Sequence, residues 1–315
     1  MNPKENLLQV LRRENPAYVP VPDEGVIWSC AASFIERPQA SGFDGFGVKW
    51  EWGGDIIGTY PVDYPIRDLS QLKDYKFPDP SDDKYYRDIR EALKAIDRTK
   101  VLTMADNGFG LFERAWLLMG MDNLLVYMLT NKDEIKWLLH KIADFKIAKT
   151  KKFIELGIEA IHYGDDWGTQ RSLFMNPDLW RELIKPEQER LYKVCRDAGV
   201  MIFQHSCGHI EEIIPDLIEI GCMCWDPCQP WANDLVKLKL LYGKEINFWG
   251  AIDSQYVLPL GSEDEVREEV KLRLKQLAPG GGYIPGPSHT VPFPEKNIRA
   301  MNDAVRQFGK YPLAF

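Results

Sequence analysis

The sequence predicts an α/β fold of the (β/α)8 barrel class, the TIM type. From residue 157 onward, short apolar runs alternate with helical segments, and the connections between them are short. Such alternation favours a parallel sheet. Five of these units, with at least two earlier strands, indicate a closed barrel; an open doubly wound sheet is the alternative. The fingerprint of a dinucleotide site, Gly-x-Gly-x-x-Gly after a strand, is absent.

The predicted strands are short runs rich in β-branched, aromatic or sulfur-containing residues, each followed by a polar cluster. They are expected at 101–104, 158–163, 200–204, 222–225, 246–249 and 282–285. Helices are expected at 83–97, 111–155 (two or three), 176–199, 210–220, 234–242, 262–277 and 295–308. Pro186 predicts a kink in the helix at 176–199. Ser262 and Glu265 have the spacing of a capping box at the start of the helix that follows them.

The N-terminal part follows a different pattern. A helix is expected at 6–13 and a short strand at 19–21, whereas 22–80 is predicted to be loop-like, with a hairpin at 48–60. A long segment of this kind usually forms a lid or a lining rather than a linker. We therefore predict one domain over residues 1–315, with a helical and hairpin extension at its N-terminal end.

Composition restricts the class of protein. The 315 residues carry a net charge of −8, which argues against binding to nucleic acid or to an anionic membrane surface. No run of about 18 apolar residues is present, and the first residues lack the pattern of a signal peptide. Six cysteines in a chain of this length do not indicate a disulfide framework. These observations predict a cytoplasmic protein, and they are compatible with a homodimer.

His205 and Cys207 are the first candidate metal ligands. They end the predicted strand at 200–204, and side chains at i and i+2 of an extended chain lie on one face, roughly 6.6 Å apart. A histidine nitrogen and a thiolate can both reach one zinc ion from that spacing. Gly208 then allows the backbone to turn away from the site. The alternative is a small core cysteine beside a hydrogen-bonded histidine.

A catalytic zinc requires a third protein ligand and an open fourth position. His289 is the first choice, because it follows the last predicted strand, which should lie near the middle strands in a closed barrel. Cys228 and Asp226 are the reserve candidates. A histidine in a proline-rich loop without any metal role is the alternative reading of His289.

Other predicted strands also end in reactive side chains. In an α/β barrel these ends converge on the face that carries the active site. Asp106 is therefore expected to contact substrate. Asp165 and Asp166 could act as catalysts if one carboxyl raises the pKa of the other, so that it donates a proton or anchors substrate. Alternatively, they fix the turn as hydrogen-bond acceptors.

Several stretches resemble the uroporphyrinogen decarboxylase superfamily. The resemblance covers nearly the whole chain and is strongest at residues 213–221, 248–253 and 280–289. It implies a (β/α)8 barrel. The decarboxylases themselves carry an Arg-Gln-Ala-Gly-Arg signature near the N-terminus, but the matching region here, 26–32, has no arginine. A substrate with many carboxylates needs clustered guanidinium groups, so this branch is disfavoured.

The zinc methyltransferases of corrinoid systems are the other branch of that superfamily. They resemble this chain in a His-x-Cys at a strand end, which His205 and Cys207 match. Their third ligand, usually a cysteine, lies near the last strand, where this chain has His289. The resemblance implies a Zn²⁺ enzyme that exchanges a methyl group with the cobalamin of a separate corrinoid protein, which cycles between methyl-cobalamin and Co(I).

The aromatic residues favour an aryl methyl ether as the substrate, which the enzyme would O-demethylate. Trp167 and Trp249 lie at or just past strand ends, and Tyr163 lies beside a polar cluster. Together with Trp28 of the long N-terminal lining, they are expected to hold a flat ring. Alternatively, these large side chains fill the barrel. A thiol or folate methyltransferase, a metal-free decarboxylase of a small acid and a barrel that only binds a ligand remain the alternative functions.

Overall fold

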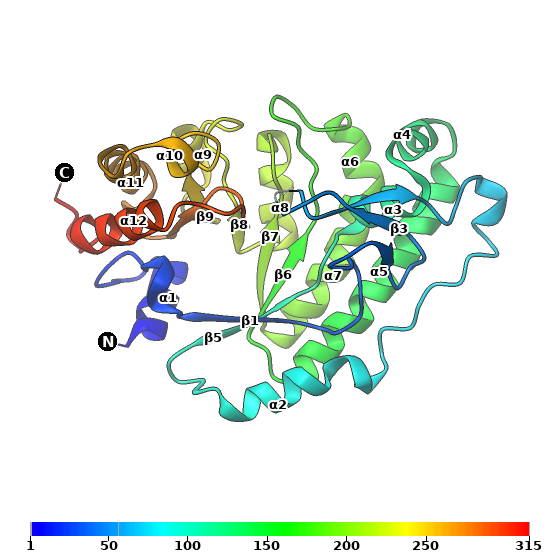
Figure 1. Cartoon of the computed structure of the whole chain (residues 1–315), viewed down its shortest axis with the longest axis horizontal. Helices are drawn as coiled ribbons and strands as arrows, with labels where there is room; N and C mark the ends of the chain where they lie inside the picture. Colours follow the sequence, from blue (N-terminus) through cyan, green and yellow to red (C-terminus); the bar gives the residue numbers. More distant parts are fainter. Residues whose placement is uncertain (1, 56, 315) are drawn as a thin grey trace.

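Seven parallel strands form the central sheet of the computed structural model, which describes residues 2–55 and 57–314 (Figure 1). They are β1 (Ile27–Ala31), β5 (Leu102–Asp106), β6 (Ala160–Gly164), β7 (Met201–His205), β8 (Cys224–Asp226), β9 (Asn247–Ile252) and β10 (Tyr283–Pro287). Their order in the sheet is their order in the chain, and all neighbours are parallel. A doubly wound sheet would reverse its strand order at a switch point. The TIM-type fold class is therefore confirmed.

The strand count differs from the prediction of eight. Within the described residues the sheet has seven strands, and β1 and β10 are its two edges. The sheet therefore curls as an open, barrel-like layer.

Helices follow most strands and cover the outside of the sheet (Figure 1). They are α1 (Pro3–Arg12), α2 (Arg87–Ala95), α3 (Leu111–Met119), α4 (Met121–Thr130), α5 (Lys132–Glu155), α6 (Pro177–Leu183), α7 (Lys185–Ala198), α8 (Ile214–Ile220), α9 (Leu235–Tyr242), α10 (Val257–Leu260), α11 (Glu263–Leu277) and α12 (Glu295–Phe308). The predicted kink is a break between α6 and α7, with Pro186 in the first turn of α7. The predicted capping box at Ser262 and Glu265 is present.

The N-terminal prediction was wrong at two points. Residues 27–31 were expected in a loop, but they form β1 and pair in parallel with β5. Residues 19–21 were expected to form a strand; instead Val19 donates a backbone hydrogen bond to Gly309, and the neighbouring Tyr18 makes an isolated bridge with Lys310. In both cases the partner lies at least 70 residues away in the sequence, so local composition could not decide.

The predicted hairpin is confirmed and belongs to a small antiparallel sheet. Its strands are β2 (Gly42–Phe43), β3 (Lys49–Trp52) and β4 (Thr59–Asp63), in that order. Trp50 of β3 is buried and stacks on Phe109, with 6.0 Å between the ring centroids. This contact holds the small sheet against the loop that follows β5.

Inside the curled sheet, an apolar layer lies below the carboxyl ends of the strands. Leu102, Met104, Ala160, Phe203, Cys224 and Ile284 form it, and Leu7 and Leu11 of α1 pack against it. Because side chains alternate along a strand, Phe203 and His205 of β7 lie on the same face. The apolar layer therefore supports the polar side chains at the carboxyl ends of the strands.

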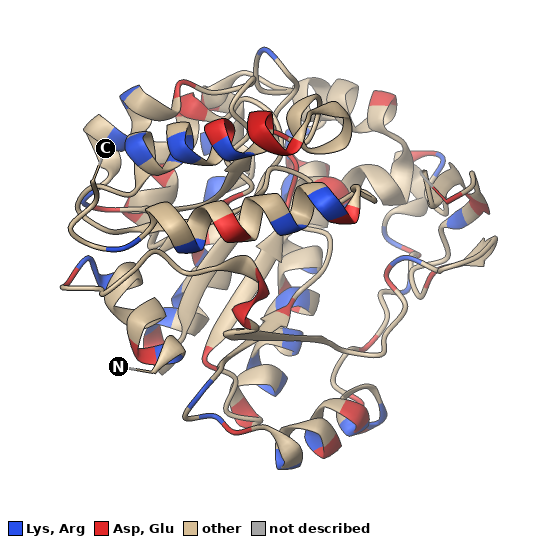
Figure 2. Cartoon of the chain, turned by 60° about the vertical axis from the view of Figure 1, so that its left-hand side comes forward, with Lys and Arg blue, Asp and Glu red and all other residues tan. Residues whose placement is uncertain are grey.

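The surface carries both signs of charge. Lys and Arg alternate with Asp and Glu along the outer helices in Figure 2. Among the described residues, no helix combines the length and the apolar character that a membrane crossing requires.

We predict that Phe203→Ala lowers the free energy of unfolding by about 3–5 kcal/mol, because it leaves a cavity in the inner apolar layer. Phe203 is fully buried and packs edge-on against Trp249. Urea denaturation measures the change. Phe43→Ala is the control: its side chain is 65% exposed, so we expect a change of about 0.5 kcal/mol or less. Equal effects of the two substitutions would contradict this description of the core.

Candidate active site

One large cavity of about 1310 Å³ lies at the carboxyl ends of the strands. Each of the seven strands contributes to its lining, through Ser29, Met104, His162, His205, Asp226, Trp249 and Gly286 among others. Residues 32–39, after β1, and residues 289–291, after β10, complete the walls. α/β-barrel enzymes keep their active sites at this end of the sheet.

The structure brings His205, Cys207 and His289 together at this cavity. The Cys207 Sγ lies 3.5 Å from His205 Nε2 and 3.8 Å from His289 Nδ1. Zinc–nitrogen and zinc–sulfur bonds of about 2.0–2.1 and 2.3 Å, at a tetrahedral angle, separate the two ligand atoms by about 3.6 Å. Each histidine nitrogen therefore lies at zinc-ligand spacing from the Cys207 sulfur, whereas the group whose ligand atoms all lie within 4.8 Å of one another joins His205 and Cys207 to Asp166.

Asp166 supplies a fourth donor atom beside these three. Its Oδ1 lies 3.4 Å from His205 Nε2, and the two side chains form a group with Cys207 that has the spacing of a metal site. The same Oδ1 accepts the backbone N–H of Cys207 at 2.8 Å. Asp166 therefore either completes the coordination or holds the Cys207 backbone in place.

Asp226 orients His205. The sheet register pairs His205 with Asp226, so their side chains meet in one layer, and Nδ1 of His205 lies 2.9 Å from Asp226 Oδ2. The other oxygen, Oδ1, lies 2.8 Å from His162 Nε2. A carboxylate on Nδ1 leaves Nε2 directed at Cys207, the arrangement that is usual for histidines that bind metals. Asp226 was a reserve candidate for the third metal ligand, but it contacts Nδ1 of His205, whereas the Cys207 sulfur lies near Nε2.

Burial opposes ionisation of Asp226, but the two histidines outweigh it and lower the pKa of this carboxyl below its ordinary value. In turn, although burial acts against it, Asp226 raises the pKa of both His162 and His205. Burial raises the pKa of the Cys207 thiol. His162, His205 and Asp226 thus form an ion pair network beside the Cys207 thiol.

The turn after Cys207 has little room. Gly208 has φ +79°, and a Cβ there would come within 2.3 Å of the Gly168 backbone. A side chain at position 208 would therefore displace the loop that carries Asp166. Cys228, the other reserve ligand, is fully buried, and its thiol donates to the Trp225 carbonyl at 3.1 Å, so it does not join this group.

Asp165 has a different environment from Asp166. It is fully buried, and its carboxylate accepts the backbone N–H groups of Phe112 and Glu113 at 2.9 and 2.8 Å and the indole N–H of Trp167 at 2.8 Å. Burial nevertheless raises its pKa to about 7. Asp165 therefore holds the start of α3, a contact that the sequence did not predict, and it is not among the residues that line the cavity.

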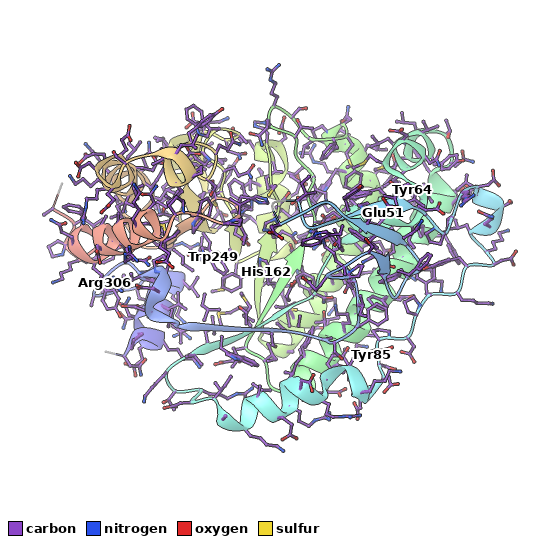
Figure 3. All side chains as sticks on the ribbon, in the orientation of Figure 1. Glu51, Tyr64, Tyr85, His162, Trp249 and Arg306 are labelled. Atoms are coloured by element: carbon purple, nitrogen blue, oxygen red, sulfur yellow. The ribbon has the colours of Figure 1, made fainter. Side chains whose placement is uncertain are left out.

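The predicted substrate contacts divide into two groups. Trp249 and Asp106 line the cavity, and the Trp249 ring lies 6.2 Å from the His162 ring, near the centre of the molecule (Figure 3). Trp28, Tyr163 and Trp167 do not line it. Tyr163 faces outward because it alternates with His162, and its hydroxyl lies 2.9 Å from the Thr150 hydroxyl.

Sequence reasoning missed several residues of the cavity, among them His162 and Glu113. His162 was not among the predicted site residues, yet its position two residues before the strand's end puts it on the inner face. Glu113 of α3 also lines the cavity. Burial, followed by the charges of Asp166 and Asp165, raises the pKa of Glu113 well above its ordinary value. No sequence pattern predicts Glu113, because its position depends on how α3 packs over β6.

A parallel barrel that gathers His, Cys and carboxylate side chains at its carboxyl end has the fold and site of an α/β-barrel enzyme. Residues 42–308 match the family described as uroporphyrinogen decarboxylase (URO-D), and the chain belongs to that family.

Known relatives fall into two groups. The methylcobamide:CoM methyltransferase MtaA of Methanosarcina barkeri is 25% identical over 188 residues, which cover 55% of this chain and 52% of that protein. The uroporphyrinogen decarboxylase of Bacillus thuringiensis (strain Al Hakam) is 25% identical over 265 residues, 80% of this chain and 72% of that protein. The matched region thus spans about half the length of the first relative.

A solved structure described as a methyltransferase from Methanosarcina mazei shares the fold. It superposes with a TM-score of 0.75 at 18% identity and covers 98% of this chain and 99% of that one.

We predict that Asp165→Asn lowers the free energy of unfolding by about 1–3 kcal/mol, because it weakens buried hydrogen bonds at the start of α3. Thermal or urea denaturation measures the loss. Asp106→Asn is the matched control, since the Asp106 side chain is 53% exposed. An Asp165→Asn protein as stable as the control would show that Asp165 does not hold α3.

Proposed function

We propose that this protein is a zinc-dependent methyltransferase that exchanges a methyl group between a small substrate and the cobalamin of a separate corrinoid protein. The observation that carries this proposal is the position of Cys207 Sγ, 3.5 Å from Nε2 of His205 and 3.8 Å from Nδ1 of His289, the two histidines that line the cavity. Donor set and spacing both fit a mononuclear zinc site with an open position.

The residues around that site have separate tasks. His205, Cys207 and His289 would hold the ion, and zinc bound there supplies a Lewis acid for the heteroatom that carries the methyl group. Asp226 keeps His205 in the tautomer that presents Nε2. Asp166 accepts the Cys207 N–H and keeps the turn in place.

The M. barkeri relative supports a corrinoid as the second reactant, since its name identifies methylcobamide as its substrate. We propose that the corrinoid protein docks transiently over the carboxyl end of the barrel, where the cavity lies. A weak, reversible encounter of this kind needs only a small interface.

Within this class we propose an aryl methyl ether as the substrate. Trp249, Phe34, Phe109 and Phe293 all line the cavity. Stacked or edge-to-face contacts with a flat ring add about 0.5–1.5 kcal/mol per pair beyond the buried area. His162, held by Asp226, lies against Trp249 and limits where the ring can go.

Decarboxylation is the second candidate, because the Bacillus relatives match over a longer region than the methyltransferase does. Two cavity residues among those described, Arg37 and Lys149, carry cationic side chains other than histidine. A small acid would fit this number of cations better than a tetrapyrrole with many carboxylates does. Zinc content separates the two functions.

We predict that the purified protein contains about one zinc per chain, as expected for a single mononuclear site. His205→Ala and Cys207→Ser should reduce the zinc content to nearly none, because each removes one of three ligands. Atomic absorption or mass spectrometry of the metal content measures this.

His289→Ala should lose zinc in the same way, whereas Cys228→Ser and Cys222→Ser should keep it. Both control cysteines are buried, and their thiols donate to carbonyl groups of β8. A zinc-free wild-type protein with full activity would contradict the proposal. Loss of zinc in Cys228→Ser but not in His289→Ala would show that the third ligand is assigned wrongly.

For the substrate, we predict that methoxybenzenes transfer their methyl group to a Co(I) corrinoid protein in the presence of this enzyme. The cobalt absorption spectrum should change from Co(I) to methyl-Co(III), because the aromatic walls place the ring beside the site. Methylated thiols, amines and folates are the comparison substrates. Conversion with these and not with the ring compounds would exclude the aryl ether.

A further inference from the structure

A second group of charged side chains, separate from the His205 group, also reaches this cavity. Glu36 is its centre: its Oε2 accepts from Lys146 Nζ at 2.7 Å and from Arg114 at 3.3 Å, and its Oε1 accepts from Lys149. Arg114 also pairs with Asp44 at 2.9 Å. We refer to these five residues as the Glu36 cluster.

The Glu36 cluster has more cations than anions. Arg114, Lys146 and Lys149 stand against the two carboxylates of Glu36 and Asp44, and all five are buried. An uncompensated charge away from water is costly. Burial lowers the pKa of Lys146 to about 7 even though Glu36 lies against it. With all three cations protonated the cluster holds one positive charge in excess, and the lowered pKa of Lys146 reflects the cost of that excess charge.

Lys149 is the cation of the Glu36 cluster that lines the cavity. Lys149 and Glu36 line the cavity, whereas Lys146, Arg114 and Asp44 do not. An ammonium group has three N–H donors. The donors of Lys149 reach Glu36 and the Asn107 carbonyl, the latter at 3.0 Å, which leaves one donor without a partner among the described residues.

The backbone at Gly108 and Gly164 lies between the Glu36 cluster and the turn that carries Asp166. A Cβ on Gly108 would lie 2.8 Å from the Glu36 carboxylate, and a Cβ on Gly164 would lie 2.8 Å from the Gly108 carbonyl oxygen. Gly164 directly precedes Asp165 and Asp166. Phe34, two residues before Glu36, and Phe109, directly after Gly108, also line the cavity. Residues of the Glu36 cluster and of the His205 group therefore line the same cavity.

We propose that Lys149 forms a subsite for a singly charged carboxylate of the substrate, so that the substrate is an aryl methyl ether that carries a carboxylate. This inference rests on the proposed function for the methyl ether and on the Glu36 cluster for the carboxylate. A bound carboxylate would take the free donor of Lys149 and bring the cluster to electrical balance. The aromatic ring would then lie along the apolar wall, with its methoxy group toward His205.

The test compares two ligands of the same shape, 4-methoxybenzoate and 4-methoxybenzyl alcohol, by calorimetry on the protein as purified. We expect the wild type to bind the carboxylate at least about tenfold more tightly, as a charge-assisted hydrogen bond in a buried site gives. Lys149→Met should lose this preference and leave the affinity for the alcohol unchanged. Lys151→Met, on the exposed side of the same helix, should keep it.

Folding of the Lys149→Met protein can be checked independently. The substitution leaves Arg114 and Lys146 against Glu36 and Asp44, a balanced set, so we expect a melting temperature close to that of the wild type. Lys149→Arg keeps the charge and should retain most of the preference for the carboxylate. Equal affinities of the wild type for both ligands, or an undiminished preference in Lys149→Met, would overturn the subsite.

This measurement does not depend on methyl transfer. If the carboxylate preference depends on Lys149 but no methyl group reaches a Co(I) corrinoid protein, the subsite stands and the proposed function fails. If neutral methoxybenzenes are demethylated as well as methoxybenzoate is, the methyltransferase stands and the subsite fails.

Discussion

The carboxylate of Asp226 lies between two histidines, and the arrangement of the cavity depends on this contact. It fixes which nitrogen of His205 faces the Cys207 sulfur, and it holds His162 against Trp249. The sheet register makes the contact: Gly164, His205 and Asp226 are paired across β6, β7 and β8. A shift of one residue in any of these strands would turn its polar end out of the cavity.

The apolar interior of the barrel and the residues of the candidate active site lie at different levels along the strands. Below the layer of His162, His205 and Asp226, Phe203 and the other inner side chains fill the inside of the sheet with apolar contacts. Above it, the loops carry Asp166, Cys207 and His289 on turns that start from rigid strands. Asp165 does not face the cavity; it connects one of these turns to the start of α3. A site built on strand ends and tied to a neighbouring helix holds its ligand atoms more precisely than one on free loops does.

The sequence was sufficient for the fold class and for the proximity of His205 and Cys207, because both depend on local periodicity. Alternating strands and helices predicted the parallel sheet, and the i, i+2 spacing predicted that His205 and Cys207 share a face. The first strand, β1, could not be predicted because it pairs with β5, some 75 residues away. Tyr163 could have been recognised as outward-facing from its alternation with His162. The orientation of Trp167 could not be predicted, because it lies in a turn, where side chains follow no regular alternation. The contact between Glu36 and Lys149 could not be predicted either, because these residues are far apart in the sequence and meet only in the folded chain.

The central claim is that one sulfur and two histidine nitrogens of this chain bind a single zinc ion. X-ray absorption at the zinc edge of the purified protein tests it most directly. We predict one sulfur at about 2.3 Å and two or three nitrogen or oxygen ligands at about 2.0–2.1 Å, with the sulfur contribution absent in Cys207→Ser. A spectrum with two or more sulfur ligands, or with none, would contradict the site described above.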